Sequence, residues 1–211
     1  MKSCKFFSAL FGLLGICAAV AGIFLSLHFR NAGPVLLKQS EAAEAQVHAM
    51  LYAVKNNEFG RVGDMLYGQP AIGADRLPTE DVGVLLWEAF LDSLSYELEG
   101  EFHATESGVA RNVTITTLDV SSITDVLRDR AQTMLQDRVA HTADADDVYD
   151  QNNEYREEFV MAVLYDAAKS ALETDGRTMT HRITINLIYE NGQWWIMPED
   201  GLLDAITGGF I

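Results

Sequence analysis

Five histidines are the side chains of this 211-residue chain best suited to acid–base chemistry or transition-metal binding. They are His28, His48, His103, His141 and His181. No two of them have the spacing of a helical metal-binding pair such as His-Glu-x-x-His. The sequence also contains no Gly-x-Ser-x-Gly nucleophile motif and no phosphate-binding glycine loop. We therefore predict a protein without catalytic, cofactor-binding or metal-binding residues.

His181 is the histidine with a candidate role, as a contact for a small-molecule ligand. It alternates with Met179 and Ile183 in an extended segment, so these side chains share one predicted face of a sheet. Together with Tyr96 or Tyr189, His181 would line a polar spot in an otherwise apolar cavity. The alternative is a hydrogen-bonded histidine near the end of a strand.

The acidic stretch DADDVYDQNNE offers oxygen ligands of the kind that calcium prefers. These are Asp144, Asp146, Asp150, Asn152 and Glu154. The register does not fit a calcium-binding loop, because the turn position lacks a glycine and Glu154 falls one place short of the closing glutamate. A solvated, partly disordered acidic loop is therefore the favoured interpretation.

Two adjacent tryptophans, Trp194 and Trp195, follow the hairpin signal Asn191-Gly192. Two aromatic rings form a stacking platform only when both point the same way. Neighbouring residues on a strand point to opposite faces, so these two rings cannot form one platform.

The apolar segment 6–29 is predicted to anchor the chain in a membrane. It is 24 residues long, and a helix of about that length spans the ~30 Å hydrocarbon core of a bilayer. Lys2 and Lys5 precede it, which favours residues 1–5 in the cytoplasm and a single-pass protein whose C-terminal domain lies outside.

Two other interpretations of this segment remain open. The Ala-Val-Ala at 19–21 is a candidate cleavage site of a signal peptide. Cys17 is a candidate site of lipidation, although Ile16 before it departs from the lipoprotein motif.

The remaining chain, a linker at 30–37 and one domain at 38–211, is strongly acidic. From residue 31 onwards it holds all 31 acidic residues but only 12 of the 15 basic ones, which gives a formal charge of −19 (12 basic minus 31 acidic). Nucleic acids and anionic lipid surfaces both require a basic patch, so we exclude them as partners. Neither cysteine lies in the domain, which therefore has no disulfide.

Hydrophobic periodicity and turn residues divide the domain into clustered helices and paired strands. The predicted helices cover 37–55, 59–66, 79–94, 121–139 and 154–173, the predicted strands cover 94–104, 109–119, 178–190 and 193–198, and 199–211 is a short amphipathic tail. This order predicts an α+β fold with antiparallel hairpins rather than a parallel α/β sheet.

Three stretches carry a resemblance to a known family: NVTITTLD leading into a helix, INLIYENGQWWIM, and LLDAITGG near the end. With the opening helices, they resemble the nuclear-transport-factor-like (cystatin-like cone) superfamily, in particular membrane-anchored domains of Gram-positive bacteria whose role is uncharacterised. The resemblance implies a cone-shaped domain in which a curved antiparallel sheet wraps around helices. It places Trp194 and Ile196 on the core side and turns Trp195 towards the C-terminal tail or a partner. The helical segment 121–174 is longer than that fold requires.

We therefore expect a membrane-anchored extracytoplasmic domain with a binding or scaffolding role and no catalysis. The alternative is a small-molecule receptor or an enzyme that uses the cone interior, as ketosteroid isomerase and the polyketide cyclases do, although no residue here matches their sites. An interior filled by Trp87, Phe90, Phe102 and Trp194 favours the first function, whereas polar groups that converge near His181 favour the second. A third option, a homodimer or protein complex through the open sheet face, requires an exposed apolar patch that includes Trp195.

Overall fold

The computed structural model describes residues 40–70, 72 and 77–210 of the chain. The predicted membrane segment at 6–29 and the predicted linker at 30–37 therefore lie outside the described residues. Within the described ranges, no helix combines the length and the apolar character that crossing a membrane requires.

Helices and strands follow the order that the sequence predicts, and the α+β fold class is confirmed. The elements are α2 (Ser40–Lys55), α3 (Phe59–Met65), α4 (Asp81–Ser93), β1 (Ser95–Ala104), β2 (Gly108–Leu118), α5 (Val120–His141), the 3₁₀ turn η2 (Ala145–Asp147), α6 (Glu157–Asp175), β3 (Thr178–Glu190), β4 (Gln193–Ile196) and α7 (Asp200–Thr207). The amphipathic tail thus forms a short helix.

The described residues form one antiparallel sheet, with strand order β1-β2-β3-β4, and it contains both predicted hairpins. The second hairpin turns at Asn191 and Gly192, whose φ angles of 55° and 84° are the left-handed conformation that a two-residue turn requires. The register of β1 shifts between Glu99 and His103, and Gly100 adopts a φ of 60° within this irregularity. The turn predicted at Asn191-Gly192 is confirmed. The irregularity in β1 has no indication in the sequence other than a glycine within a strand.

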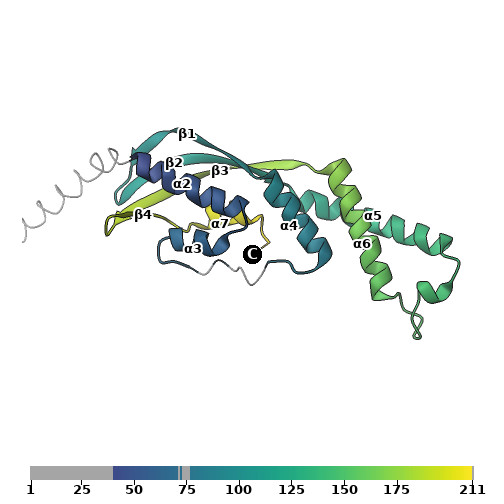
Figure 1. Cartoon of the computed structure of the whole chain (residues 1–211). Coiled ribbons are helices and arrows are strands. Elements are labelled where there is room, and N and C mark those ends of the chain that lie inside the picture. The colour runs from purple at the N-terminus through teal and green to yellow at the C-terminus, as the bar shows by residue number, and fades with distance from the viewer. Residues whose placement is uncertain (1–39, 71, 73–76, 211) are drawn as a thin grey trace, which may run out of the picture.

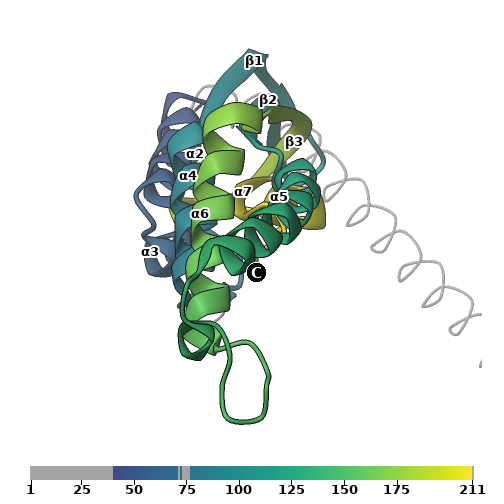
Figure 2. The same cartoon turned by 90° about the vertical axis from the view of Figure 1, so that its right-hand side faces the viewer.

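Helices α2, α4 and α7 pack on one face of the sheet, and α3 lies beside α2 (Figure 1). We call these helices and the sheet the body of the molecule. Viewed from the right-hand end of Figure 1, α2 and α4 lie on one side and the strands β1, β2 and β3 on the other (Figure 2). The apolar stripe of α2 faces the core, because Val47, Met50, Leu51 and Val54, spaced at i, i+3, i+4 and i+7, are all fully buried.

Aromatic side chains fill the interior of the body. Trp87, Phe90, Phe102 and Trp194 are each between 0% and 8% exposed. Trp87 stacks on Phe90 with ring centroids 5.4 Å apart, and the edge of Phe210 packs on Trp87 at 5.1 Å. Gly208, which ends α7 with a φ of 59°, fits against Phe90 so closely that a Cβ would lie 2.4 Å from the ring. The C-terminal tail therefore closes the aromatic interior.

Helices α5 and α6 form a hairpin that projects beyond the body (Figure 1). We call residues 120–175 the arm. Asp119 caps α5, since its carboxylate accepts hydrogen bonds from the Ser122 amide at 3.1 Å and the Ser121 hydroxyl at 2.7 Å. The cap starts the helix one residue before the predicted 121.

Helix α6 begins at Glu157, three residues after the predicted 154, because the preceding residues form a turn of their own. Tyr149 and Tyr155 pair as an antiparallel bridge, and their rings stack at 5.2 Å. The Arg156 amide donates to the Val148 carbonyl at 2.9 Å. These contacts hold the chain extended where the sequence predicts helix, and they correct the prediction of a partly disordered loop.

Candidate functional site

The three residues predicted to contact an interior ligand lie on the inner side of the sheet, but they do not converge. Tyr96 of β1 and His181 of β3 pair with the same residue of β2, the fully buried Ile115. Two strand spacings, about 10 Å, therefore separate Tyr96 from His181. Tyr189 lies further along β3, about 26 Å from His181, and its ring packs at 5.1 Å on that of Trp194.

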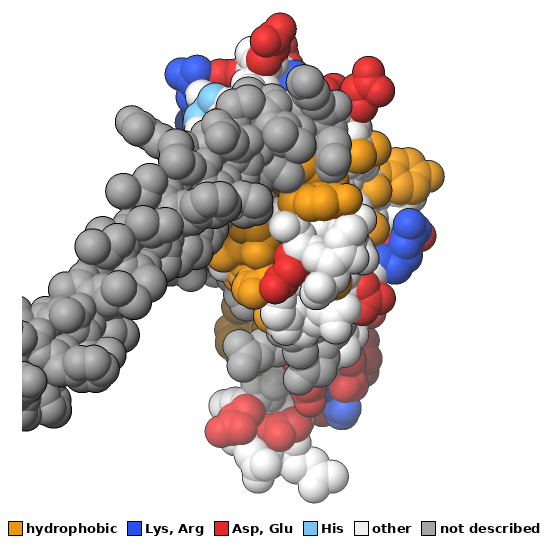
Figure 3. Space-filling model, turned by 90° about the vertical axis from the view of Figure 1, so that its left-hand side faces the viewer, with side chains coloured by type: hydrophobic (Ala, Val, Ile, Leu, Met, Phe, Trp, Pro, Cys, Tyr) orange, Lys and Arg blue, Asp and Glu red, His pale blue; other side chains and the backbone are white. Residues whose placement is uncertain are grey.

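Tyr189 lies instead at the turn end of the β3–β4 hairpin, where it is 38% exposed. Figure 3 views this end of the body and shows hydrophobic side chains at the surface next to acidic ones. The position of Tyr189 gives it no access to the inner surface around His181.

Tyr96 belongs to a polar cluster between α2 and the sheet, together with His48, Glu44 and Arg111. The Tyr96 hydroxyl lies 2.9 Å from Nδ1 of His48, and the two rings are 5.6 Å apart. Glu44 lies 3.6 Å from Nε2 of His48 and accepts a 2.7 Å hydrogen bond from Arg111. Burial raises the pKa of the Tyr96 hydroxyl, so this group stays neutral at physiological pH.

Arg111 occupies an inward-facing position of β2, between Val109 and Val113. Its side chain is 12% exposed, and its guanidinium lies 5.3 Å from the centroid of the Phe102 ring. Its Nε is buried without a hydrogen-bond partner among the described residues. A charge at such a position is costly without a counter-ion, and Glu44 of α2 supplies one. The cluster therefore joins α2 to the sheet, and this is a structural role.

The two tryptophans of β4 point to opposite faces, as the strand geometry predicts. Trp194 is 4% exposed in the core, which confirms its predicted packing role. Trp195 faces the outer side of the sheet, is half-buried, and pairs with Ile188. The rest of this outer face carries cross-strand polar contacts, such as Thr184 to Asn112 at 2.8 Å. Trp195 and Ile188 are therefore the apolar pair on a largely polar face.

The acidic segment that suggested calcium uses its carboxylates within the loop. Asp150 accepts hydrogen bonds from the amides of Asn152 at 2.8 Å and Glu154 at 2.9 Å, and these bonds lower the pKa of its carboxyl. Asp144 accepts one from the Asp146 amide at 3.0 Å. Among the described residues, no group of His, Cys, Asp and Glu side chains is arranged to hold a metal ion.

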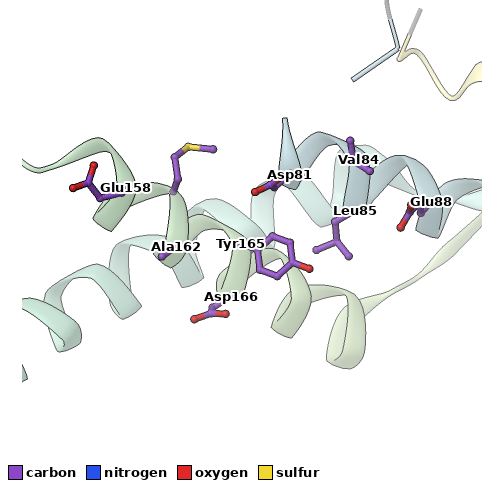
Figure 4. A pocket seen from close by; sticks show the side chains of 9 residues that line it. Asp81, Val84, Leu85, Glu88, Glu158, Ala162, Tyr165 and Asp166 are labelled. Atoms are coloured by element: carbon purple, nitrogen blue, oxygen red, sulfur yellow. The ribbon is translucent and has the colours of Figure 1, made fainter. Parts of the chain in front are cut away.

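An open groove lies between α4 and α6, at the junction of body and arm (Figure 4). Its volume is about 710 Å³, and it is open to solvent. It is lined by Asp81, Val84, Leu85 and Glu88 of α4 and by Glu158, Met161, Ala162, Tyr165 and Asp166 of α6. We call this the α4–α6 groove.

The groove exists because α4 is apolar on two sides. Its inward side buries Trp87, Phe90 and Leu91 in the core, while Val84 and Leu85 remain partly exposed on the side that faces α6. The sequence of α4 is apolar nearly all round, which is typical of a helix between two other elements, and α4 contacts both the sheet and α6. The sequence signal was an all-round apolar helix, but it did not reveal that the second contact is incomplete.

Four of the residues that line the groove are acidic and none is basic. Two of the four acidic side chains have a basic side chain nearby. Arg138 of α5 pairs with Asp166, and Nη1 of Arg156 lies 3.5 Å from Glu158. No ion pair with Asp81 or Glu88 occurs among the described residues. The groove therefore combines an apolar floor with excess negative charge, a chemistry that suits cationic and partly apolar groups.

We found no similarity to known proteins on which to base a function: no family model, no curated protein and no solved structure matches the chain.

Proposed function

We propose that this chain is a membrane-anchored extracytoplasmic domain that binds or scaffolds other molecules and performs no catalysis. One observation carries the proposal over a receptor or enzyme that uses an interior cavity. Trp87, Phe90, Phe102 and Trp194, which would have to leave room for an interior ligand, are all buried and packed together with the core. A filled interior leaves the outer surfaces as the place for recognition.

The proposal includes the predicted anchor at 6–29 and a nuclear-transport-factor-like cone at 38–211. Support for the cone comes from two antiparallel hairpins in one sheet and from helices gathered on a single face of it (Figure 2). The arm is an addition to such a cone, consistent with the length of the segment 121–174.

Protein recognition fits the surface better than nucleic-acid or membrane recognition does. The acidic groove and the formal charge of −19 after residue 30 (12 basic minus 31 acidic) repel phosphates and anionic headgroups. A partner would instead present basic residues. A homodimer through the outer sheet face receives weaker support, because polar cross-strand contacts occupy this face further along β2 and β3.

Two measurements on the full chain test this proposal. A reporter enzyme that works only outside the cytoplasm should be active when it is fused after Ile211. Activity of a reporter that works only in the cytoplasm, fused at the same place, contradicts the proposed topology. Native mass spectrometry of the purified chain should show the mass of the polypeptide without a retained small molecule. A stoichiometric small molecule that survives purification and is lost in a His181→Ala variant would favour the interior receptor instead.

A further inference from the structure

We propose that the α4–α6 groove binds an amphipathic helix of a partner protein, with basic side chains at both ends of a short apolar stripe. The inference rests on the proposed binding function, to which it adds the place and the chemistry of the partner. It does not depend on whether the interior of the body is filled.

The floor of the groove is the first argument, because it supplies apolar contact area. Val84, Leu85 and Met161 are partly exposed, and Tyr165 is 40% exposed. Figure 4 shows Tyr165 and Leu85 in the middle of the groove, contributed by α6 and α4 respectively. Apolar side chains gathered in an open groove release water when a complementary apolar surface covers them.

The distribution of charge is the second argument. Glu158 and Glu88 lie at opposite ends of the groove, with the apolar floor between them (Figure 4). Both side chains are exposed, so their carboxylates are solvated and available to a partner. The Arg156 side chain near Glu158 forms an exposed contact of the kind that contributes little energy and is readily exchanged. A partner with Lys or Arg at each end of its apolar stripe would therefore match the groove from end to end.

The walls of the groove decide the backbone conformation of the partner. Both walls are helices, whose amides and carbonyls in the middle of the element already bond within the helix. An extended strand would find no open sheet edge here to pair with its own backbone. A helix satisfies its backbone internally and presents side chains alone, which is how helices dock into grooves of this kind.

A labelled peptide provides the direct test on the full chain, reconstituted in nanodiscs of uncharged phosphatidylcholine. The probe is a fluorescent amphipathic peptide of about four helical turns, with leucines on one face and a lysine pair at each end. We expect saturable binding by fluorescence anisotropy, weakened by added salt because the charged contacts are screened. Empty nanodiscs, and a peptide with serines in place of the leucines, should show little binding.

Matched variants separate the groove from the general acidity of the surface. The double variant E88Q/E158Q should weaken binding by about three- to tenfold, as the loss of two exposed charge pairs predicts. The control E101Q/E106Q makes the same change in net charge on exposed residues outside the groove, and it should alter binding by less than about twofold. Equal weakening by both double variants would overturn the proposal, because net charge alone would then attract the peptide.

A second pair tests the apolar floor. Tyr165→Ser should weaken binding by about fivefold through lost apolar contact, whereas Tyr52→Ser, at a side chain that is 61% exposed on α2, should not. Three results would each contradict a partner helix in the groove. They are unchanged binding by the Tyr165→Ser variant, no saturable binding up to millimolar peptide, and self-association of the chain that blocks the peptide. The proposed function is tested separately. It would still hold if the peptide failed to bind, provided that the reporter after Ile211 lies outside the cytoplasm and mass spectrometry detects no retained small molecule.

Discussion

The body and the arm are stabilised by different interactions. The body buries large apolar side chains from α2, α4, α7 and the inner face of the sheet in one continuous cluster. From the arm, that cluster includes Ile123 at the base of α5 and little else. The other arm residues that are buried are mostly small, namely Ala131, Val148, Val163, Ala167, Ala168 and Ala171. Small side chains bury little area, so the arm depends on polar contacts to a greater degree.

Arg130 illustrates how the arm is held. From α5 it donates hydrogen bonds to the Ser170 carbonyl at 3.0 Å and to the Asp175 carboxylate at 2.6 Å, both on α6. Nearer the tip, Arg138 pairs with Asp166. Polar contacts at half-exposed positions are weaker than buried apolar packing and are sensitive to salt. The body therefore sets the global stability, whereas the arm can open locally without unfolding the body.

The largest expected effect lies in the body. Trp194→Ala should reduce the free energy of unfolding by about 3–5 kcal/mol, because it removes a large buried aromatic side chain. Chemical denaturation measures this change. Trp195→Ala is the matched control, since the same residue type on the outer face should cost much less. Equal costs for the two variants would contradict the sidedness of β4.

An intermediate effect is expected where α5 meets α6. Arg130→Ala should cost about 1–2 kcal/mol, a value discounted for the partial exposure of Arg130 and Asp175. Hydrogen exchange should speed up in the amides of α5 and α6 while the amides of α2 keep their protection. If exchange in α2 speeds up to the same extent, then body and arm unfold as one unit, which contradicts local opening of the arm.

The smallest effect concerns the start of the arm and depends on pH. Hydrogen bonds from the Ser122 amide and the Ser121 hydroxyl hold the pKa of Asp119 below its ordinary value. Asp119→Ala should therefore cost about 1 kcal/mol at neutral pH through the lost cap. Asp119→Asn retains a capping oxygen and so should cost less.

The sign of the pH dependence follows from the lowered pKa of Asp119. Stability from such a group is present above the unfolded pKa of about 3.9, and it is lost as the pH falls through the lower folded pKa. Between about pH 4 and pH 2, unfolding free energies should therefore decline more for the wild-type chain than for Asp119→Asn. Parallel declines would show that Asp119 is not a titrating cap.

Much of the fold was predictable because its signals are local. The period of α2, the alternation of β1 and β3, and the Asn191-Gly192 turn each depend on residues close together in the chain. The boundary of α6 was not predictable in the same way. Residues 154–156 carry no strong helix-breaking signal, and the contact between Tyr149 and Tyr155 decides their conformation.

The candidate site was predicted less well than the fold. The alternation of residues in β1 and β3 correctly placed Tyr96 and His181 on the inner face of the sheet. Two side chains on the same face need not be in contact, and here Ile115 of β2 lies between them. The polar cluster of Tyr96 includes Arg111 and Glu44, which are 67 residues apart in the chain. Only the packing of α2 on the sheet could pair them.

By itself, the sequence determined the order of helices and strands, the opposite facing of Trp194 and Trp195, and the acidic character of everything after residue 30. These properties follow from chain geometry and from composition, which need no distant contacts. The tertiary structure alone decided that aromatic side chains fill the interior and that an apolar, acidic groove remains between α4 and α6. Both results depend on how closely elements distant in sequence pack, and close packing is a property of volumes and shapes in three dimensions.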